Sequence, residues 1–201
     1  VGRSSTMIMT ESSVQKAKGS GAVYVSSAKV TLSTLSVKNT TCASDDDGAV
    51  SCVASTLKLN KNSNITGTSG RGLKSTRCSL VMRDTHIAHN VARANGAAML
   101  LISKSDLEVS RSVFASNTGG GDGGAVACEE CMSFSLQDST FDGNVAARGG
   151  ALYLRDLPTD SIIQATRFEN NTAKRGGGGA IYQIGPTFPS IDTRCVFLEN
   201  S

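Results

Sequence analysis

Two cysteines with the spacing of a metal-binding or redox pair are the first residues of this sequence that could do chemistry. They enclose two acids in Cys128-Glu129-Glu130-Cys131. A zinc site needs a second such pair or nearby histidines, and the two histidines, His86 and His89, lie about forty residues away, around Ile87. We therefore expect surface histidines and structural cysteines rather than a metal centre, and we predict no cofactor.

A run of acidic residues, Asp45-Asp46-Asp47-Gly48, is the second candidate for chemistry. Enzymes that cleave polysaccharides need two or three carboxylates on one strand face, often with calcium. This run precedes a glycine, where a solvated turn is the ordinary structure. Asp84, Glu108 and Asp138 are expected to lie singly on outward positions. We therefore predict no catalytic residue, and we do not expect the chain to be an enzyme.

The cysteines and the glycosylation motifs indicate an oxidising, extracellular location. The six cysteines, all of them candidate disulfide partners, are Cys42, Cys52, Cys78, Cys128, Cys131 and Cys195. Cys42 and Cys52 bracket the acidic run and could close it into a small loop, whereas the spacing of the other four fixes no pairing. Three Asn-x-Thr sequons place candidate glycans on Asn39, Asn64 and Asn170.

The composition of the chain indicates the kind of core it forms and excludes some classes of partner. The 201 residues include 21 glycines, no tryptophan and only 4% aromatic residues, which favours thin stacked layers over an ordinary globular core. The net charge is +3, and the basic residues are scattered along the sequence without a stripe, so nucleic acid is not an expected partner. No apolar run approaches the ~20 residues of a membrane span. Both ends resemble cuts from a longer chain.

A Gly-Gly-Ala motif recurs through the chain, and its spacing points to a repeat architecture. Clear copies start at Gly123, Gly149 and Gly178, and weaker copies contain Gly21-Ala22, Gly48-Ala49, Gly72-Leu73 and Gly96-Ala97. The residues after the last glycine of each copy lie at positions 22, 49, 73, 97, 125, 151 and 180, which are 24–29 residues apart.

A second motif, Phe-x-x-Asn, runs in phase with the first. It begins at Phe114, Phe141, Phe168 and Phe197, has an Ile variant at Ile87–Asn90, and is altered at Val37–Thr40. Short segments between the motifs carry apolar residues at every second position, as in Leu107-Glu108-Val109-Ser110. That alternation predicts β-strands with one buried face, and no segment shows helical periodicity.

A unit of about 25 residues with such short strands cannot bury its apolar face alone, so it must stack on its neighbours. We predict an all-β fold, a right-handed parallel β-helix of about seven coils of 24–29 residues. Residues 1–19 are expected to be an irregular segment or a partial coil. Residues 20–201 are expected to form the repeats, which continue beyond residue 201.

Stacking places equivalent side chains of successive coils over one another. A buried aromatic column is predicted from Phe114, Phe141, Phe168 and Phe197. A hydrogen-bonded amide ladder is predicted from Asn117, Asn144, Asn171 and Asn200. Glycine is expected at the sharp corners, where the backbone needs a positive φ.

These paired motifs resemble the repeats of the polymorphic outer membrane proteins of chlamydiae, whose passenger regions are surface β-helices. Similar repeats occur in the wider group of pectin-lyase-like β-helices, including giant extracellular proteins of algae and protists. The resemblance is strongest over residues 114–201 and implies a surface location and a solenoid fold. Any anchoring segment is expected to lie outside this sequence.

Two functions remain open. The first is a non-catalytic extracellular structural or adhesive element, such as a stalk or filament, whose partners are further repeats, a second copy of itself, glycans or host cell-surface proteins. The second is a carbohydrate-binding or polysaccharide-degrading β-helix with its site in loops or outside this sequence. The segments Arg155–Ser161 and Gly185–Ser190 carry prolines that suit loops leaving the solenoid wall.

Overall fold

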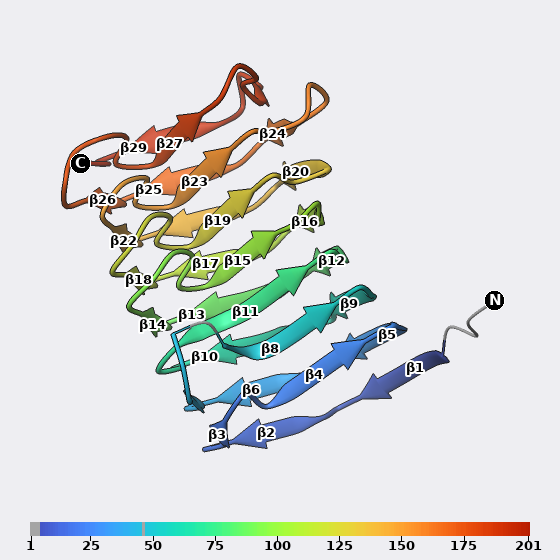
Figure 1. The fold of residues 1–201 in the computed structure, drawn as a ribbon. Helices are drawn as coiled ribbons and strands as arrows, with labels where there is room; N and C mark the ends of the chain where they lie inside the picture. Colours follow the sequence, from blue (N-terminus) through green and yellow to red (C-terminus); the bar gives the residue numbers. More distant parts are fainter. Residues whose placement is uncertain (1–4, 46) are drawn as a thin grey trace.

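The repeats fold into stacked coils, and the computed structural model describes them over residues 5–45 and 47–201 (Figure 1). All of the strand pairs between successive coils are parallel, and the described residues contain no helix. The all-β parallel β-helix of about seven coils that the motif spacing predicts is therefore confirmed.

Each full coil passes through three long sheets, here called sheets 3, 1 and 2 in the order in which the chain visits them. Sheet 1 contains β1 (Ser5–Thr10), β5 (Ala28–Ser33), β9 (Thr56–Asn60), β12 (Ser79–Arg83), β16 (Asp106–Ser110), β20 (Ser133–Gln137), β24 (Ile162–Gln164) and β28 (Ser190–Ile191). Sheet 2 contains β2 (Ser13–Gln15), β6 (Ser36–Lys38), β10 (Ser63–Thr66), β13 (Thr85–Ala88), β17 (Val113–Ala115), β21 (Thr140–Asp142), β25 (Arg167–Glu169) and β29 (Val196–Leu198).

Sheet 3 and a narrow sheet 4 complete the wall. Sheet 3 contains β4 (Val23–Ser26), β8 (Gly48–Val53), β11 (Arg71–Thr76), β15 (Met99–Ile102), β19 (Val126–Glu129), β23 (Leu152–Arg155) and β27 (Ile181–Ile184). Sheet 4 contains β14 (Val91–Ala92), β18 (Thr118–Gly119), β22 (Val145–Ala146) and β26 (Thr172–Ala173), and the pair β3 (Lys18–Gly19) with β7 (Thr41–Cys42) lies at the N-terminal end.

The apolar positions of each strand point inward and stack in register. In sheet 1, for example, Leu57 pairs with Leu80 and Leu80 with Leu107, and all three side chains are buried. The same register repeats in each sheet, so the core is one continuous cluster built of apolar columns that run along the solenoid. Polar residues alternate with them on the outer surface, as a strand with one buried face requires.

The corners between sheets differ from the prediction, because most of them do not use glycine. The residue with positive φ at the corner after sheet 1 is Asp84, Arg111 or Asp138 in successive coils, and at the corner after sheet 2 it is His89 or Ser116. A single left-handed residue costs an L-amino acid only about 1–2 kcal/mol. The hydrogen bonds between coils at these corners offset that cost, so sequence composition there is free to vary.

Glycine is required in the Gly-Gly-Ala motif, for two reasons. Gly149 has φ of +59°, a left-handed conformation. Gly150 does not, but a Cβ placed on it would overlap the carbonyl oxygen of Gly179 in the next coil. The first glycine therefore makes the turn, and the second allows two backbones to approach.

The N-terminal segment, expected to be irregular or a partial coil, contains three strands in its described part. β1 pairs with β5, β2 with β6 and β3 with β7, all in parallel. The described residues 5–19 therefore lie on the next coil as part of the solenoid, and residues 1–4 lie outside the described part.

Candidate functional site

The predicted aromatic column is a stack of four phenylalanine rings inside sheet 2. Their centroids are 4.7 Å apart for Phe114 and Phe141, 5.1 Å for Phe141 and Phe168, and 4.9 Å for Phe168 and Phe197. The first three rings are fully buried, but Phe197 is 45% exposed. The expectation that all four are buried is wrong for Phe197, because no coil covers it within the described structure.

The predicted amide ladder lies beside the aromatic column. The side chain of Asn144 accepts hydrogen bonds from the backbone and side-chain nitrogens of Asn117, and it donates to the carbonyl of Phe114 and to Oδ1 of Asn171. Asn90, Asn117 and Asn171 repeat this pattern, and Asn200 donates to the carbonyl of Phe168. The amides from Asn90 to Asn171 are thus bonded to the coils on both sides, whereas Asn200 is bonded to the preceding coil.

The ladder loses its amides toward the N-terminus. Thr68 follows a corner glycine in the coil before Asn90, and its backbone nitrogen donates to Oδ1 of Asn90 as a ladder residue would. Thr40 occupies the same place one coil earlier, so the sequence Val37–Thr40 has Thr where the other coils have Asn. The hydroxyls of Thr40 and Thr68 are buried and make no hydrogen bond.

Replacing Thr68 with asparagine is expected to raise the free energy of unfolding by about 1 kcal/mol. The new amide would reach Oδ1 of Asn90 and the carbonyl of Val37, and a buried hydrogen bond contributes about that much. Urea denaturation followed by circular dichroism measures the change. Thr31→Asn, on the outer face of β5, is the control, because Asn gains no ladder partner there and suits a strand poorly. Equal effects at the two positions would contradict the prediction.

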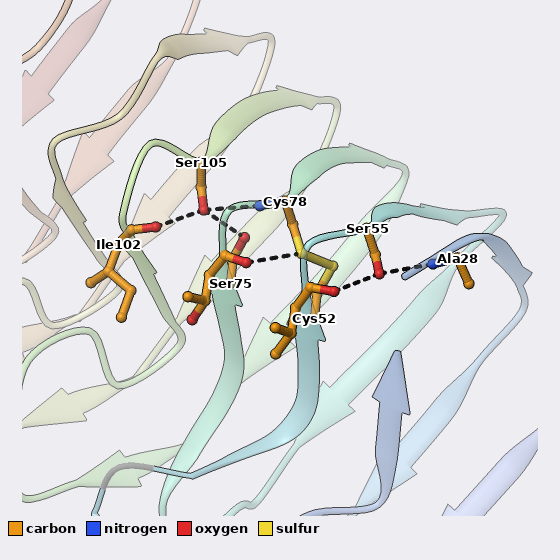
Figure 2. The surroundings of a disulfide bond; sticks show 9 residues. Ala28, Cys52, Ser55, Ser75, Cys78, Ile102 and Ser105 are labelled. Carbon is orange, nitrogen blue, oxygen red and sulfur yellow. Dashed lines mark hydrogen bonds between the residues drawn. A yellow bond between two sulfur atoms is a disulfide. The ribbon is translucent and has the colours of Figure 1, made fainter. Parts of the chain in front are cut away.

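The disulfides differ from the predicted Cys42–Cys52 pairing. Cys52 on β8 instead bonds to Cys78 at the start of the next coil's sheet 1 (Figure 2). Cys128 bonds to Cys131. The prediction was wrong because Cys52 points into the core, where Cys78 is stacked against it, whereas Cys42 lies in the narrow β7 strand. The thiols of Cys42 and Cys195 are free.

The Cys52–Cys78 disulfide occupies a position that serine fills in the following coil. Ser75 is the register partner of Cys52, and its hydroxyl donates to Oγ of Ser105, which in turn accepts from the backbone nitrogen of Cys78 (Figure 2). This corner between sheets 3 and 1 is therefore held by a covalent link in one coil and by a buried hydroxyl pair in the next.

The acidic run forms part of a polar loop rather than a metal centre. Its described members are Asp45 and Asp47, and Asp46 lies outside the described residues. The buried guanidinium of Arg71 donates to the backbone carbonyls of Asp45 and Asn95. Burial, assisted by the charge of Asp47, raises the pKa of the Cys42 thiol. Within the described part of the chain, no three His, Cys, Asp or Glu side chains gather as metal ligands would.

Asp84 and Glu108, two of the acids expected singly on outward positions, pair with cations that neighbouring coils supply. Arg111 donates two hydrogen bonds to Asp84 one coil earlier, and Arg83 pairs with Glu108 one coil later. The hydrogen bond from Arg111 lowers the pKa of Asp84. Pairs as exposed as these contribute about 0.2–1 kcal/mol each, so they add little to the stability of the stack.

The sequons and the histidines all lie on or near the surface. Asn39 and Asn170 are exposed and occupy the same left-handed corner in different coils, whereas Asn64 is half-buried in β10 and its Oδ1 lacks a hydrogen-bond partner. His86 and His89 are both exposed, as expected.

The two proline-containing segments lie outside the strands. Residues 156–161 connect β23 to β24, and residues 185–189 connect β27 to β28, at a corner that other coils turn with fewer residues. Phe188, in the second segment, is 69% exposed. No helix among the described residues has the length and apolar character to cross a membrane.

Comparison with protein families supports the motif resemblance. Residues 138–155 and 165–183 match the model of the Chlamydia polymorphic membrane protein repeat. These segments contain the motif residues Phe141, Phe168 and Gly149, and together they cover less than half of the chain. Searches of curated proteins and of solved structures gave no match. The chain therefore carries repeats similar to those of a surface protein family, in a parallel β-solenoid.

Proposed function

We propose that this chain is a non-catalytic, extracellular structural or adhesive segment of a larger surface protein, in which the stacked solenoid is itself the function. The observation that carries the proposal is the register of the internal columns. The phenylalanine stack and the amide ladder pass unbroken through four coils and end at Phe197 and Asn200, on the axial face of the last coil.

Both axial faces of the described solenoid expose apolar side chains and strand edges. Met7 is exposed on β1, and Ile191 and Phe197 are exposed at the opposite end, each in register with a buried residue of the neighbouring coil. Open strand edges recruit further strands. We propose that further repeats, of the same chain or of a second copy of it, stack head to tail on these faces so that the parallel register continues.

The charge distribution favours that head-to-tail orientation. Residues 1–102 contain twelve Lys and Arg and five Asp and Glu, a net charge of +7, whereas residues 103–201 contain eight and twelve, a net charge of −4. A solenoid with a basic N-terminal half and an acidic C-terminal half attracts another copy pole to pole. A head-to-tail contact also repeats without closing, which produces a rod.

Sedimentation analysis of the purified chain tests the stacking. We expect concentration-dependent association that weakens as salt is added, because the attraction between the poles is screened. Phe197→Lys should weaken association about tenfold or more, since it puts a charge into the proposed contact. Val113→Lys adds the same charge at a mid-solenoid position that is 38% exposed and should leave association unchanged. Circular dichroism verifies that both variants fold.

Two results would contradict the proposal. One is a monomer at all accessible concentrations, with the two variants indistinguishable from the unchanged chain. The other is hydrolysis or elimination of a polysaccharide by the purified chain, detected as new reducing ends, which would favour the carbohydrate-active alternative.

A further inference from the structure

Basic residues that are scattered in the sequence meet in one groove on the solenoid surface. Lys29, Arg77 and Lys104 are 48 and 27 residues apart, which is two coils and one coil. All three line an open groove of about 540 Å³ at the corner between sheets 3 and 1. The basic residues look scattered in the sequence, but coiling brings three of them to one corner of the solenoid.

Three stacked columns of residues build this groove. The left-handed corner column supplies Arg77 and Lys104, and the first outward positions of sheet 1 supply Lys29, in register with Thr56. Between these two exposed columns runs a column that points inward, and its residues form the floor. In the coil of β8 and β9 the corner residue that lines the groove is Ala54, so the cations come from the coils on either side of it.

The floor of the groove is fixed by bonds between coils. The backbone nitrogen of Ala28 donates to Oγ of Ser55 (Figure 2), and that hydroxyl donates to the carbonyl of Val53. Cys78, also in the floor, is tied to the preceding coil by its disulfide. The groove is consequently pre-formed, and a ligand would lose little free energy in ordering it.

The cations of the groove have no acidic partner within the described structure. Its one lining carboxylate is Asp106, and none of the ion pairs among the described residues includes a residue of the groove. Further along the corner column the residues become Glu130 and Asp156, so the positive stretch is limited to the N-terminal coils. A ligand with regularly spaced negative groups would lie along the solenoid axis over these coils.

The neutral lining distinguishes between kinds of polyanion. Serine and threonine hydroxyls, among them Ser55 and Thr56, line the groove, and Asp106 can accept a hydrogen bond from a sugar hydroxyl. No aromatic residue lines it, whereas proteins that hold single-stranded nucleic acid stack the bases on aromatic rings. The lining therefore suits a chain of hydroxylated rings with acidic substituents.

We propose that this groove binds a linear acidic polysaccharide, with its sulfate or carboxylate groups paired to Lys29, Arg77 and Lys104. Such binding would attach the solenoid side-on to a glycan matrix while its axial faces stay free. The inference does not rest on the self-association proposed above, because it concerns a lateral surface of a single copy.

Calorimetric titration of the whole chain at low ionic strength tests the proposal with four probes: a heparin oligosaccharide, an oligogalacturonate, neutral dextran, and single-stranded DNA of similar charge. We expect salt-sensitive binding of one or both acidic glycans and none of dextran. The triple variant Lys29→Gln/Arg77→Gln/Lys104→Gln should bind the glycan about tenfold or more weakly, because each exposed ionic contact contributes modestly. Lys38→Gln/Lys61→Gln/Arg175→Gln removes the same charge from exposed positions elsewhere and should change affinity less than about twofold.

Equal losses in the two triple variants would overturn the proposal, since net charge rather than the groove would then explain binding. Undiminished glycan affinity in the groove variant would also overturn it. If DNA binds more tightly than both glycans and depends on the same three residues, the groove is a nucleic-acid site and the polysaccharide assignment is wrong. Matched thermal unfolding curves for the variants ensure that a loss of binding is not a loss of fold.

Discussion

Replacing Phe141 with alanine is expected to lower the free energy of unfolding by about 3–5 kcal/mol, the usual cost of removing a buried aromatic side chain. Phe141 is fully buried, and its ring is stacked between Phe114 and Phe168. The coils cannot close the resulting cavity, because their spacing is set by strand hydrogen bonds at about 4.8 Å. Urea denaturation followed by circular dichroism measures the loss.

Phe188→Ala is the matched control for that substitution. Its side chain is 69% exposed in the segment between β27 and β28, so the same change of residue should alter stability by less than about 0.5 kcal/mol. Phe141→Leu fills most of the space and should cost about half as much as alanine or less. A loss below about 1 kcal/mol for Phe141→Ala would show that the aromatic column does not contribute as a packed core.

The sequence predicts the fold well wherever successive coils repeat the same chemistry. Phe141 and Phe168 are visible as a repeat because both side chain and spacing recur, and identical side chains in register are what a stacked solenoid favours. Thr40 and Thr68 occupy the ladder position of their coils, but they are threonines where the later coils have asparagine. The Phe-x-x-Asn motif therefore cannot be recognised in these two coils, although their backbones follow the same path as those of the later coils.

The disulfides and the groove were missed because they depend on register between coils rather than on nearness along the chain. Cys52 and Cys78 are 26 residues apart, close to one coil length, which is a signal that the sequence does contain. Cys42 is nearer to Cys52 in sequence but belongs to a different sheet. In a solenoid, residues one or two coils apart are neighbours, so charges and cysteines are best compared at the repeat period.

The amide ladder gives the second large expected effect. Asn144→Ala should lower the free energy of unfolding by about 3 kcal/mol or more, because it removes the partners of several buried polar groups at once. The amide of Asn117, the carbonyl of Phe114 and the amide of Asn171 would each lose a hydrogen bond. A buried polar group left without a partner costs about 1–3 kcal/mol. Asn60→Ala is the control. The side chain of Asn60 is half-buried and makes no hydrogen bond in the described structure, so its loss should lower the free energy of unfolding far less.

Asn144→Asp separates the loss of hydrogen bonds from the loss of volume, since the two side chains are nearly the same size. A buried carboxylate cannot donate to the carbonyl of Phe114 or to Asn171, and burial without a cation raises its pKa above the unfolded value of about 3.9. The protonated acid can donate one of those bonds. Relative to the unchanged chain, the variant should therefore be least impaired below about pH 4 and should lose stability as pH rises through the folded-state pKa. A stability difference independent of pH would show that the ladder's donated hydrogen bonds do not hold the coils together.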